Sequence, residues 1–537
     1  MFQQNMKMGN TGRLKTLLFV FCFPFLITST VSAQQLINPY SRTVLQSLPV
    51  TDRMKFTQTN QQDSILPLFS GTNYQHNIAK PWLAVAEVIG QNIGLNIFDR
   101  YVLKEPWAIV TLDTIKYNFK HGFVWDNDFI ATNFFWHPYN GGLYFNAARS
   151  NGLNFWQSIP FAVGGSLMWE CFGENEPASL NDLIATPIGG IAFGEITHRL
   201  SHLILNDSQR GWGRFGRELL AGIISPMDMF NRIVSGNAWR YRPYSYGNKS
   251  VYSEYPFMLG VSVSNRFITD FEGNRGSMNM ALNTRIIYGN PIIDDVRSPY
   301  DFFTANIDFN VIGNQPLVSN VDVLGLIYGK EWNKKNNYWL AGIFQHFHYS
   351  ASNPLTEGGS KPYEYAETAS FGGGLFYMKP RKQSMKPRFS GGLFANLILL
   401  GASESDYFTA NNRDYNLGNG YSVKLNTFVS FGKRWNAELR FVHYHIFTSY
   451  GYGSAEAEIN GLPENTNLNY ANVQGNQGNA RLSSINVNIG VQLSRKLRLS
   501  AEQRFYFRKT HYNYLDDVET SSTENCFKLT YTIFNMD

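Results

Sequence analysis

The sequence predicts an α+β protein in which an N-terminal helical domain precedes an antiparallel transmembrane β-barrel of about twelve strands. Three observations lead to this fold class. The chain begins like an exported protein, apolar residues then recur at helical spacing over 80–240, and from about residue 253 the apolar period changes to that of strands. Charged residues make up 16% of the chain and aromatic residues 15%, whereas soluble domains carry roughly 25% charged residues.

The first 33 residues have the pattern of a cleavable signal peptide. Three basic side chains precede an apolar run over 17–27, and Val31 and Ala33 occupy the −3 and −1 positions before a cleavage site. The mature chain then begins at about Gln34. The apolar run is too short to cross about 30 Å of hydrocarbon as a helix. We therefore expect export across the inner membrane and a location in the outer membrane.

Composition excludes several classes of protein. The net charge of +5 falls to 5 − 3 = +2 once the three basic residues of the signal peptide are removed, which is too little for a nucleic-acid-binding protein. Two cysteines remain, Cys171 and Cys526, too few for a disulfide scaffold. Beyond the signal peptide, no uncharged apolar stretch reaches the length of a transmembrane helix.

The mature chain divides into a polar lead-in over 34–79, a helical domain over 80–240 and a barrel over 250–537. Within the helical domain, apolar groups recur at helical spacing between Gly, Pro and Asn residues. The candidate helices are 80–98, 106–118, 155–172, 179–205 and 214–235. Gly189, Gly190 and Gly194 form a small-residue stripe that allows another backbone to approach closely.

The C-terminal half alternates apolar and polar residues. In 484–493, for example, Ile485, Val487 and Ile489 alternate with asparagine and other polar residues. The segments are long for a soluble sandwich, which is the alternative, and aromatic residues cluster towards their ends. Short basic turns also alternate with long Asn- and Gly-rich connections, as in barrels of the outer membrane.

The densest run of polar and aromatic residues in the helical domain lies between 136 and 202. It contains His137-Pro138-Tyr139, Tyr144 to Gly152, Trp169-Glu170, Glu176-Pro177, Asn181 to Ile184, Gly194-Glu195 and His198-Arg199. Over about 130–235 this pattern resembles an uncharacterised family of exported proteins of Gram-negative bacteria, a domain of unknown function that a β-rich region usually follows. The resemblance implies location and architecture, and it implies no activity.

Glu195, His198 and Arg199 lie on one face of the helix expected over 179–205, and with Arg149 they are the candidate catalytic residues. Glu-x-x-His is also the spacing of di-iron helical bundles, so Glu195, His198 and Glu170 are candidate metal ligands. A second Glu-x-x-His is absent from the sequence. The alternatives are a buried polar network, a metal site, and an acid–base or lipid-headgroup site.

Four further residues of this segment are candidate binding residues: His137, Asn146, Glu170 and Asp182. The first functional hypothesis is a non-enzymatic outer-membrane protein that acts in envelope organisation, transport or partner docking. The alternative is an outer-membrane enzyme that acts on lipid or another envelope component through the Glu/His/Arg residues. The sequence holds no nucleophile elbow, His-Glu-x-x-His motif or phosphate-binding loop, so whether the protein is an enzyme stays open. We expect outer-membrane lipid and the barrel-assembly machinery as partners, no nucleic acid and no cofactor, and the sequence names no partner protein.

Overall fold

The structure is a computed structural model that describes residues 79–242, 255–290, 298–357, 359–380, 387–410, 412–432, 434–451 and 472–534. The expected signal peptide and almost all of the polar lead-in lie outside these residues. Contacts divide the chain into two compact units. The smaller unit comprises Met1–Leu83, Asn146–Ser158 and Ile196–Glu254, and the larger unit comprises Ala84–Phe145, Ile159–Glu195 and Tyr255–Asp537.

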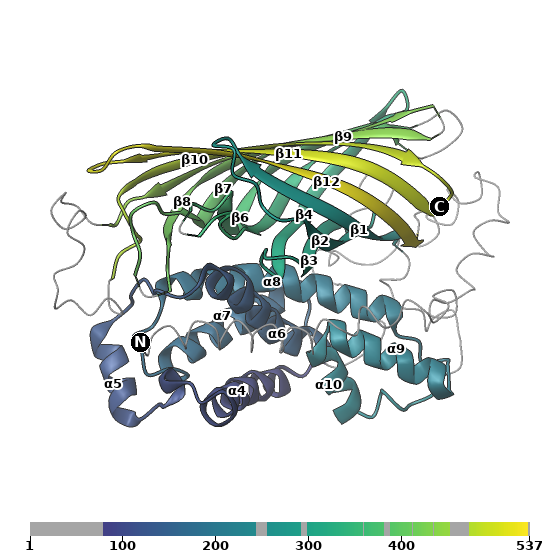
Figure 1. Cartoon of the computed structure of the whole chain (residues 1–537). Coiled ribbons are helices and arrows are strands. Elements are labelled where there is room, and N and C mark those ends of the chain that lie inside the picture. The colour runs from purple at the N-terminus through teal and green to yellow at the C-terminus, as the bar shows by residue number, and fades with distance from the viewer. Residues whose placement is uncertain are drawn as a thin grey trace. The chain divides into compact units, whose positions relative to one another are not determined.

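Helices occupy the described chain up to Val234 (Figure 1). They are α4 (Pro81–Phe98), η4 (Asp99–Leu103), η5 (Pro106–Ala108), α5 (Leu112–His121), η6 (Thr132–Trp136), α6 (His137–Ser150), α7 (Phe155–Phe172), α8 (Leu180–Ile204), α9 (Gly211–Ile224) and α10 (Pro226–Val234). Among the described helices, none combines the length and the apolar character needed to cross a membrane.

The helices differ from the expected ones in three places. The helix expected over 106–118 is the short helix η5 followed by α5, which Thr111 caps and which ends at His121. The helix expected over 214–235 is two helices, α9 and α10, which meet at Ser225. Pro226 begins α10 because a proline is tolerated in a first turn but disrupts a helix interior. α6 was not expected, because Pro138, Gly141 and Gly142 are poor helix formers. Tertiary packing against α8, described below, holds this segment in the helical form.

Twelve antiparallel strands form a closed barrel in which each strand pairs with its neighbours in sequence and β1 pairs with β12. They are β1 (Phe257–Asp270), β2 (Asn279–Tyr288), β3 (Phe303–Ile312), β4 (Val318–Lys334), β5 (Asn337–Ala351), β6 (Glu364–Pro380), β7 (Pro387–Glu404), β8 (Tyr415–Phe431), β9 (Trp435–Thr448), β10 (Gly478–Gln492), β11 (Leu497–Tyr512) and β12 (Val518–Phe534). The predicted fold class and strand number are therefore confirmed.

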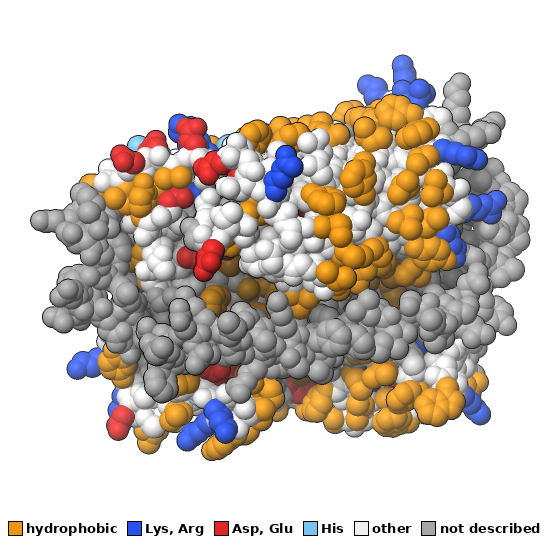
Figure 2. Space-filling view, in the orientation of Figure 1, with side chains coloured by type: hydrophobic (Ala, Val, Ile, Leu, Met, Phe, Trp, Pro, Cys, Tyr) orange, Lys and Arg blue, Asp and Glu red, His pale blue; other side chains and the backbone are white. Residues whose placement is uncertain are grey.

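The two faces of the barrel wall differ in chemistry. Outward side chains are apolar and exposed, as Leu397 (70%) on β7 and Phe527 (60%) on β12 illustrate, and Figure 2 shows such side chains gathered over the barrel wall. Inward side chains are polar and buried, as for Asp322 on β4 and Glu502 on β11. This is the alternation of a barrel with a lipid-facing exterior and a polar lumen.

Within the larger unit, α8 packs against the outside of β5. The Gln345 amide donates a hydrogen bond to the Ile188 carbonyl at 2.7 Å, and the rings of Phe193 and Phe347 lie 4.6 Å apart. Gln345 and Phe347 are both on the outer face of β5, because the residue that follows each of them, His346 and His348, contacts lumenal side chains. The first part of α8 therefore lies outside the lumen.

α6 lies against α8 with almost no side chain between them. A Cβ atom added at Gly141 would lie 1.9 Å from the Thr186 carbonyl oxygen, and one added at Gly190 would lie 2.4 Å from the backbone of Gly141. The close approach expected from the glycine stripe of α8 is confirmed. On the far side of α6, Tyr144 and Asn140 hydrogen-bond to side chains of α4.

Candidate functional site

Ion pairs cross the lumen of the barrel. The Arg440 guanidinium on β9 donates to the Asp322 carboxylate on β4 at 2.7 Å, and Arg504 on β11 lies 3.3 Å from Asp308 on β3. Neither pair of strands is adjacent in the barrel order, so these bonds bridge the interior rather than neighbouring strands. Opposite walls of the barrel are therefore tied together by charged groups.

A further buried charge inside the barrel is Arg266 on β1, which pairs with Glu524 on the adjacent strand β12. Its side chain is 1% exposed, and its Nε atom donates to the Glu524 carboxylate at 2.5 Å. Its remaining donors bond to the side chains of Asn310, Ser319 and Tyr363, which lie on or near other strands. These hydrogen bonds offset part of the free energy that it costs to bury the guanidinium. They also link β1 to the strands from which the partner side chains come.

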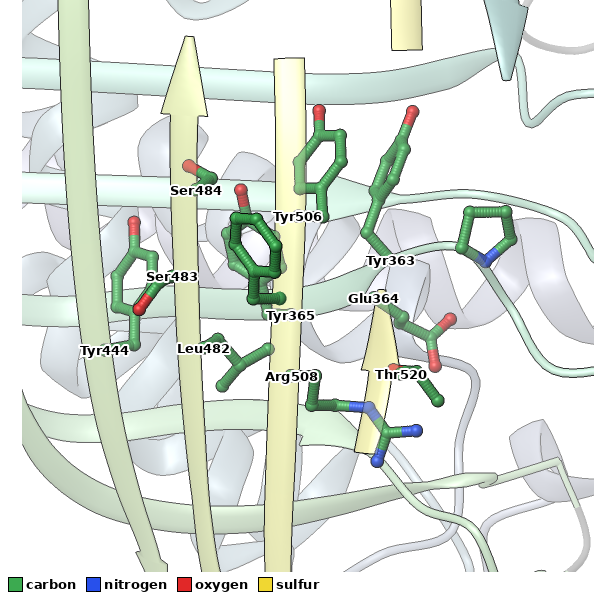
Figure 3. Close-up of a pocket in the computed structure, with 12 residues that line it drawn as sticks. Tyr363, Glu364, Tyr365, Tyr444, Leu482, Ser483, Ser484, Tyr506, Arg508 and Thr520 are labelled. Carbon is green, nitrogen blue, oxygen red and sulfur yellow. The ribbon is translucent and has the colours of Figure 1, made fainter. Parts of the chain in front are cut away.

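Several tyrosine side chains, among them Tyr363, Tyr444 and Tyr506, gather around a small cavity (Figure 3). The rings of Tyr363 and Tyr506 stack at 4.2 Å, and the Tyr444 hydroxyl is 2.5 Å from a ring nitrogen of His348. The cavity among these tyrosines has a volume of about 20 Å³, which holds roughly one water molecule. This cavity is therefore too small for a hydrated solute.

A cluster of carboxylates gathers where α8 begins, in the larger unit. We call it the carboxylate cluster; its members are Asp126, Asp128, Glu170, Glu174, Glu176 and Asp182. A histidine lies beside it: the Nε2 atom of His137 is 3.7 Å from the Asp182 carboxylate. Among the residues that the structure describes, no Lys or Arg side chain forms an ion pair with any member.

Burial and mutual repulsion keep most of this cluster protonated. Burial, followed by the charge of Asp126, raises the pKa of Asp128 to about 8, and burial raises the pKa of Glu170 to about 8. Burial acts in the same direction on Asp126, but hydrogen bonds from Asp182 and Asn133 hold the Asp126 pKa below its usual value. One member is thus ionised while its neighbours carry protons.

The start of β8 and the connection before it hold the carboxylate cluster against the barrel. The Arg413 guanidinium donates to the Asp126 carbonyl at 2.6 Å, and the Tyr415 hydroxyl donates to the Asp128 carbonyl at 2.9 Å. Asn133 donates both to Tyr415 and to the Asp126 carboxylate. Its position is therefore fixed by residues nearly 300 positions away in sequence.

A second cluster lies in the smaller unit, between the end of α8 and the start of α10. We call it the His–Asp cluster; it consists of His198, His202 and Asp228. The Nδ1 atom of His198 lies 3.0 Å from both oxygens of Asp228, and Nε2 of His202 lies 3.5 Å from Oδ1. Ser201 and Ser225 donate to Oδ2 at 3.0 and 2.7 Å. His198 therefore faces both carboxylate oxygens, while the serines bond only to Oδ2 and His202 lies beside Oδ1.

The electrostatics of the His–Asp cluster favour a neutral imidazole beside an ionised carboxylate. Burial lowers the pKa of His198 to about 4, although the charge of Asp228 acts to raise it. Burial acts to raise the pKa of Asp228, but the two histidines hold it well below its usual value. At neutral pH the His198 imidazole is uncharged and Asp228 is negative.

The candidate residues fall into these two clusters, with two exceptions. His137, Glu170 and Asp182 meet in the carboxylate cluster, where one ligand atom from each lies within 4.8 Å of the others. Asn146 donates to Ser225 beside the His–Asp cluster, and the charge of Arg149 acts on His198. Glu195 and Arg199 are both fully buried, and the charge of Glu195 acts on Tyr300. Their roles in a site stay predictions.

Sequence reasoning missed Asp228, Asp126 and Asp128. Asp228 stands three residues after Ser225, at the start of a helix where acidic residues are common for capping reasons, so its type and position gave no reason to pair it with His198. Asp126 and Asp128 lie in a segment without regular period. The signal that was available is the unusual count of acidic residues around Glu170 in a segment otherwise poor in charge.

Comparison with known proteins gives one family match over part of the chain and likenesses to solved structures. Residues 122–227 match the family described as Domain of unknown function (DUF3943), which agrees with the resemblance noted in the sequence. No curated protein matches the chain. The NanC porin structure is 9% identical, covers 50% of this chain and 98% of its own, and has a TM-score of 0.27. OmpT of Vibrio cholerae is 6% identical, covers 51% of this chain and 97% of its own, and has a TM-score of 0.23.

Proposed function

We propose that the protein is a non-conducting barrel of the outer membrane that acts in envelope organisation rather than as an open diffusion channel. The observation that carries this proposal is the set of ion pairs that cross the lumen, Arg440 with Asp322 and Arg504 with Asp308. A solute moving along the lumen would have to separate these charges, of which Asp322, Asp308 and Arg504 are largely buried. Breaking one such pair costs several kcal/mol, about 3–5 for a buried pair.

The exterior supports a membrane location for the barrel. Outward side chains such as Leu397 and Phe527 are large, apolar and exposed, and exposed apolar surface on this scale marks an interface with lipid or protein. Lipid is the partner that an antiparallel closed barrel with a polar lumen takes up. As a barrel of this kind, the chain would reach the membrane through the barrel-assembly machinery.

The helices of the larger unit extend this lipid-facing surface. The outer wall of β5 is covered by α8, α8 by α6, and α6 by α4, through the contacts described above. An apolar stripe runs along the exposed side of α4, with one residue every four positions: Val85 (37%), Ile89 (41%), Ile93 (53%) and Ile97 (51%). We assign this stripe to contact with lipid beside the barrel.

Conductance in planar bilayers tests the proposal. The full chain, recovered from the outer membrane, is expected to give no stepwise currents. A variant with Asp322→Ala, Arg440→Ala and Arg504→Ala together removes charged side chains from both cross-lumen pairs and is expected to conduct.

The matched control is Lys509→Ala with Glu519→Ala, an exposed ion pair on the same barrel. This variant is expected to stay silent, because it leaves the lumen unchanged. Stepwise currents from the unmodified chain at the level of a porin would overturn the proposal, and so would a triple variant that folds but remains silent.

A further inference from the structure

We propose that His198, His202 and Asp228 bind a zinc-class divalent metal ion. This site goes beyond the proposed envelope function and does not depend on it, since all three residues belong to the smaller unit, whereas the barrel strands belong to the larger one. Each residue offers one ligand atom, and the three atoms lie within 4.8 Å of one another.

The local sequence places the two histidines side by side. His198 and His202 are four residues apart on α8, so their side chains leave the same face of the helix one turn apart. Their rings are 4.5 Å apart between centroids. Asp228 approaches them from the first turn of α10, which the break at Ser225 and Pro226 turns back towards α8.

The spacing of the donor atoms fits a tetrahedral ion. Zinc–nitrogen bonds of about 2.0–2.1 Å imply a separation of about 3.3 Å between neighbouring ligand atoms. In the His–Asp cluster, Oδ1 of Asp228 is 3.0 Å from Nδ1 of His198 and 3.5 Å from Nε2 of His202. An ion can therefore enter the cluster with small movements of the side chains.

The residues around Asp228 prepare its carboxylate for this role. The hydroxyls of Ser201 and Ser225 both donate to Oδ2, which fixes the plane of the carboxylate and leaves Oδ1 facing the histidines. Asn146 in turn donates to the Ser225 hydroxyl at 3.2 Å. Hydrogen bonds that orient the ligands of a metal are a regular part of metal sites in proteins.

The donor set also selects the class of ion. Two imidazoles and one carboxylate suit zinc and related transition metals, whereas calcium and magnesium prefer oxygen ligands throughout. Three protein ligands leave the fourth tetrahedral position for water, as in zinc sites that are open rather than closed. The His202 side chain, 30% exposed, lies on the solvent side and gives the ion a route of entry.

Metal binding by the full chain in detergent tests the proposal. Protein stripped with a chelator is titrated with Co²⁺, whose visible absorption reports tetrahedral coordination, and the signal is then displaced with Zn²⁺. The expected result is one tetrahedral ion per chain. His202→Ala and Asp228→Asn are expected to abolish it, and Ser225→Ala, which removes an orienting hydrogen bond, is expected to weaken binding by about 10–100-fold.

Two control variants make each outcome decisive. His121→Ala alters an exposed histidine on α5 and is expected to bind Co²⁺ like the unmodified chain. His137→Ala tests the other cluster that holds a histidine and two carboxylates within ligand distance, and is expected to have no effect. The proposal is overturned if the unmodified chain binds no tetrahedral Co²⁺, if His137→Ala removes the signal, or if folded Asp228→Asn retains full affinity. Circular dichroism and the heat-dependent migration of the barrel on a gel confirm that each variant is folded.

Discussion

Replacing Glu524 by glutamine removes the charge that faces Arg266 and leaves the rest of the lumen in place. Both side chains are buried, at 0% and 1% exposure, and they are joined by a hydrogen bond of 2.5 Å. In the Glu524→Gln variant, the guanidinium keeps its neutral partners Asn310, Ser319 and Tyr363 but has lost its charged partner. It is then a buried cation whose desolvation is offset only by neutral hydrogen-bond partners.

The expected loss in the free energy of unfolding follows from that geometry. Removing one member of a buried ion pair costs about 3–5 kcal/mol. Glutamine preserves the shape of the side chain, so we expect a value near the lower end, about 3 kcal/mol. The measurement is reversible urea unfolding of the barrel in lipid or detergent, with the midpoint and slope determined for each variant.

A matched control and a double-mutant cycle separate the ion pair from general damage. Glu519→Gln breaks the exposed pair with Lys509 and is expected to leave the midpoint unchanged, because exposed pairs are screened by water. Arg266→Gln with Glu524→Gln together is expected to cost less than the sum of the two single changes. If Glu524→Gln lowers the free energy of unfolding no more than Glu519→Gln does, the lumen is solvated. The reasoning behind a non-conducting lumen is then refuted.

Three further predictions concern the helices. The pKa values of Asp128 and Glu170 are raised to about 8, so the folded chain keeps protons that the unfolded chain has already lost. The stability that the two protonated carboxyls contribute is complete at low pH, and it falls by about 1.4 kcal/mol per pH unit for each group as the pH rises towards 8. Hydrogen exchange of α7 and α8 should therefore lose protection over this pH range. Unchanged protection would contradict the raised pKa values. Gly190→Val places a side chain against the backbone of α6 and should lower the free energy of unfolding by at least about 1–3 kcal/mol. Gly164→Ala, the control, adds a methyl group in open space and should be neutral or slightly stabilising. Limited proteolysis compares the two variants, and equal sensitivity to the protease would argue against the close contact between α6 and α8. Ile93→Asp, in the exposed stripe of α4, should reduce quenching of a nearby fluorophore by a lipid-borne quencher, and equal quenching would place the stripe outside the membrane.

The sequence by itself determined the barrel. In a strand, residues two apart share a face, so the alternation of Ile485, Val487 and Ile489 already separates a lipid-facing side from a lumenal side. The strand number follows in the same way, because each connection interrupts a local pattern. The start of α10 is also set by the local sequence, because proline lacks the N–H that a helix interior requires. The break between α9 and α10 at Ser225 was nevertheless not predicted.

Only the tertiary structure decided which polar groups meet. His198 and Asp228 are separated by 30 residues, and Asn133 and Tyr415 by 282. The type of a residue shows whether its side chain needs a hydrogen-bond or ion-pair partner when it is buried. It does not show which distant residue is that partner, because this depends on the paths of α8, α10 and the barrel strands. The lumenal ion pairs are of the same kind: alternation places a charge inside the barrel, and only closure of the barrel sets it opposite its partner.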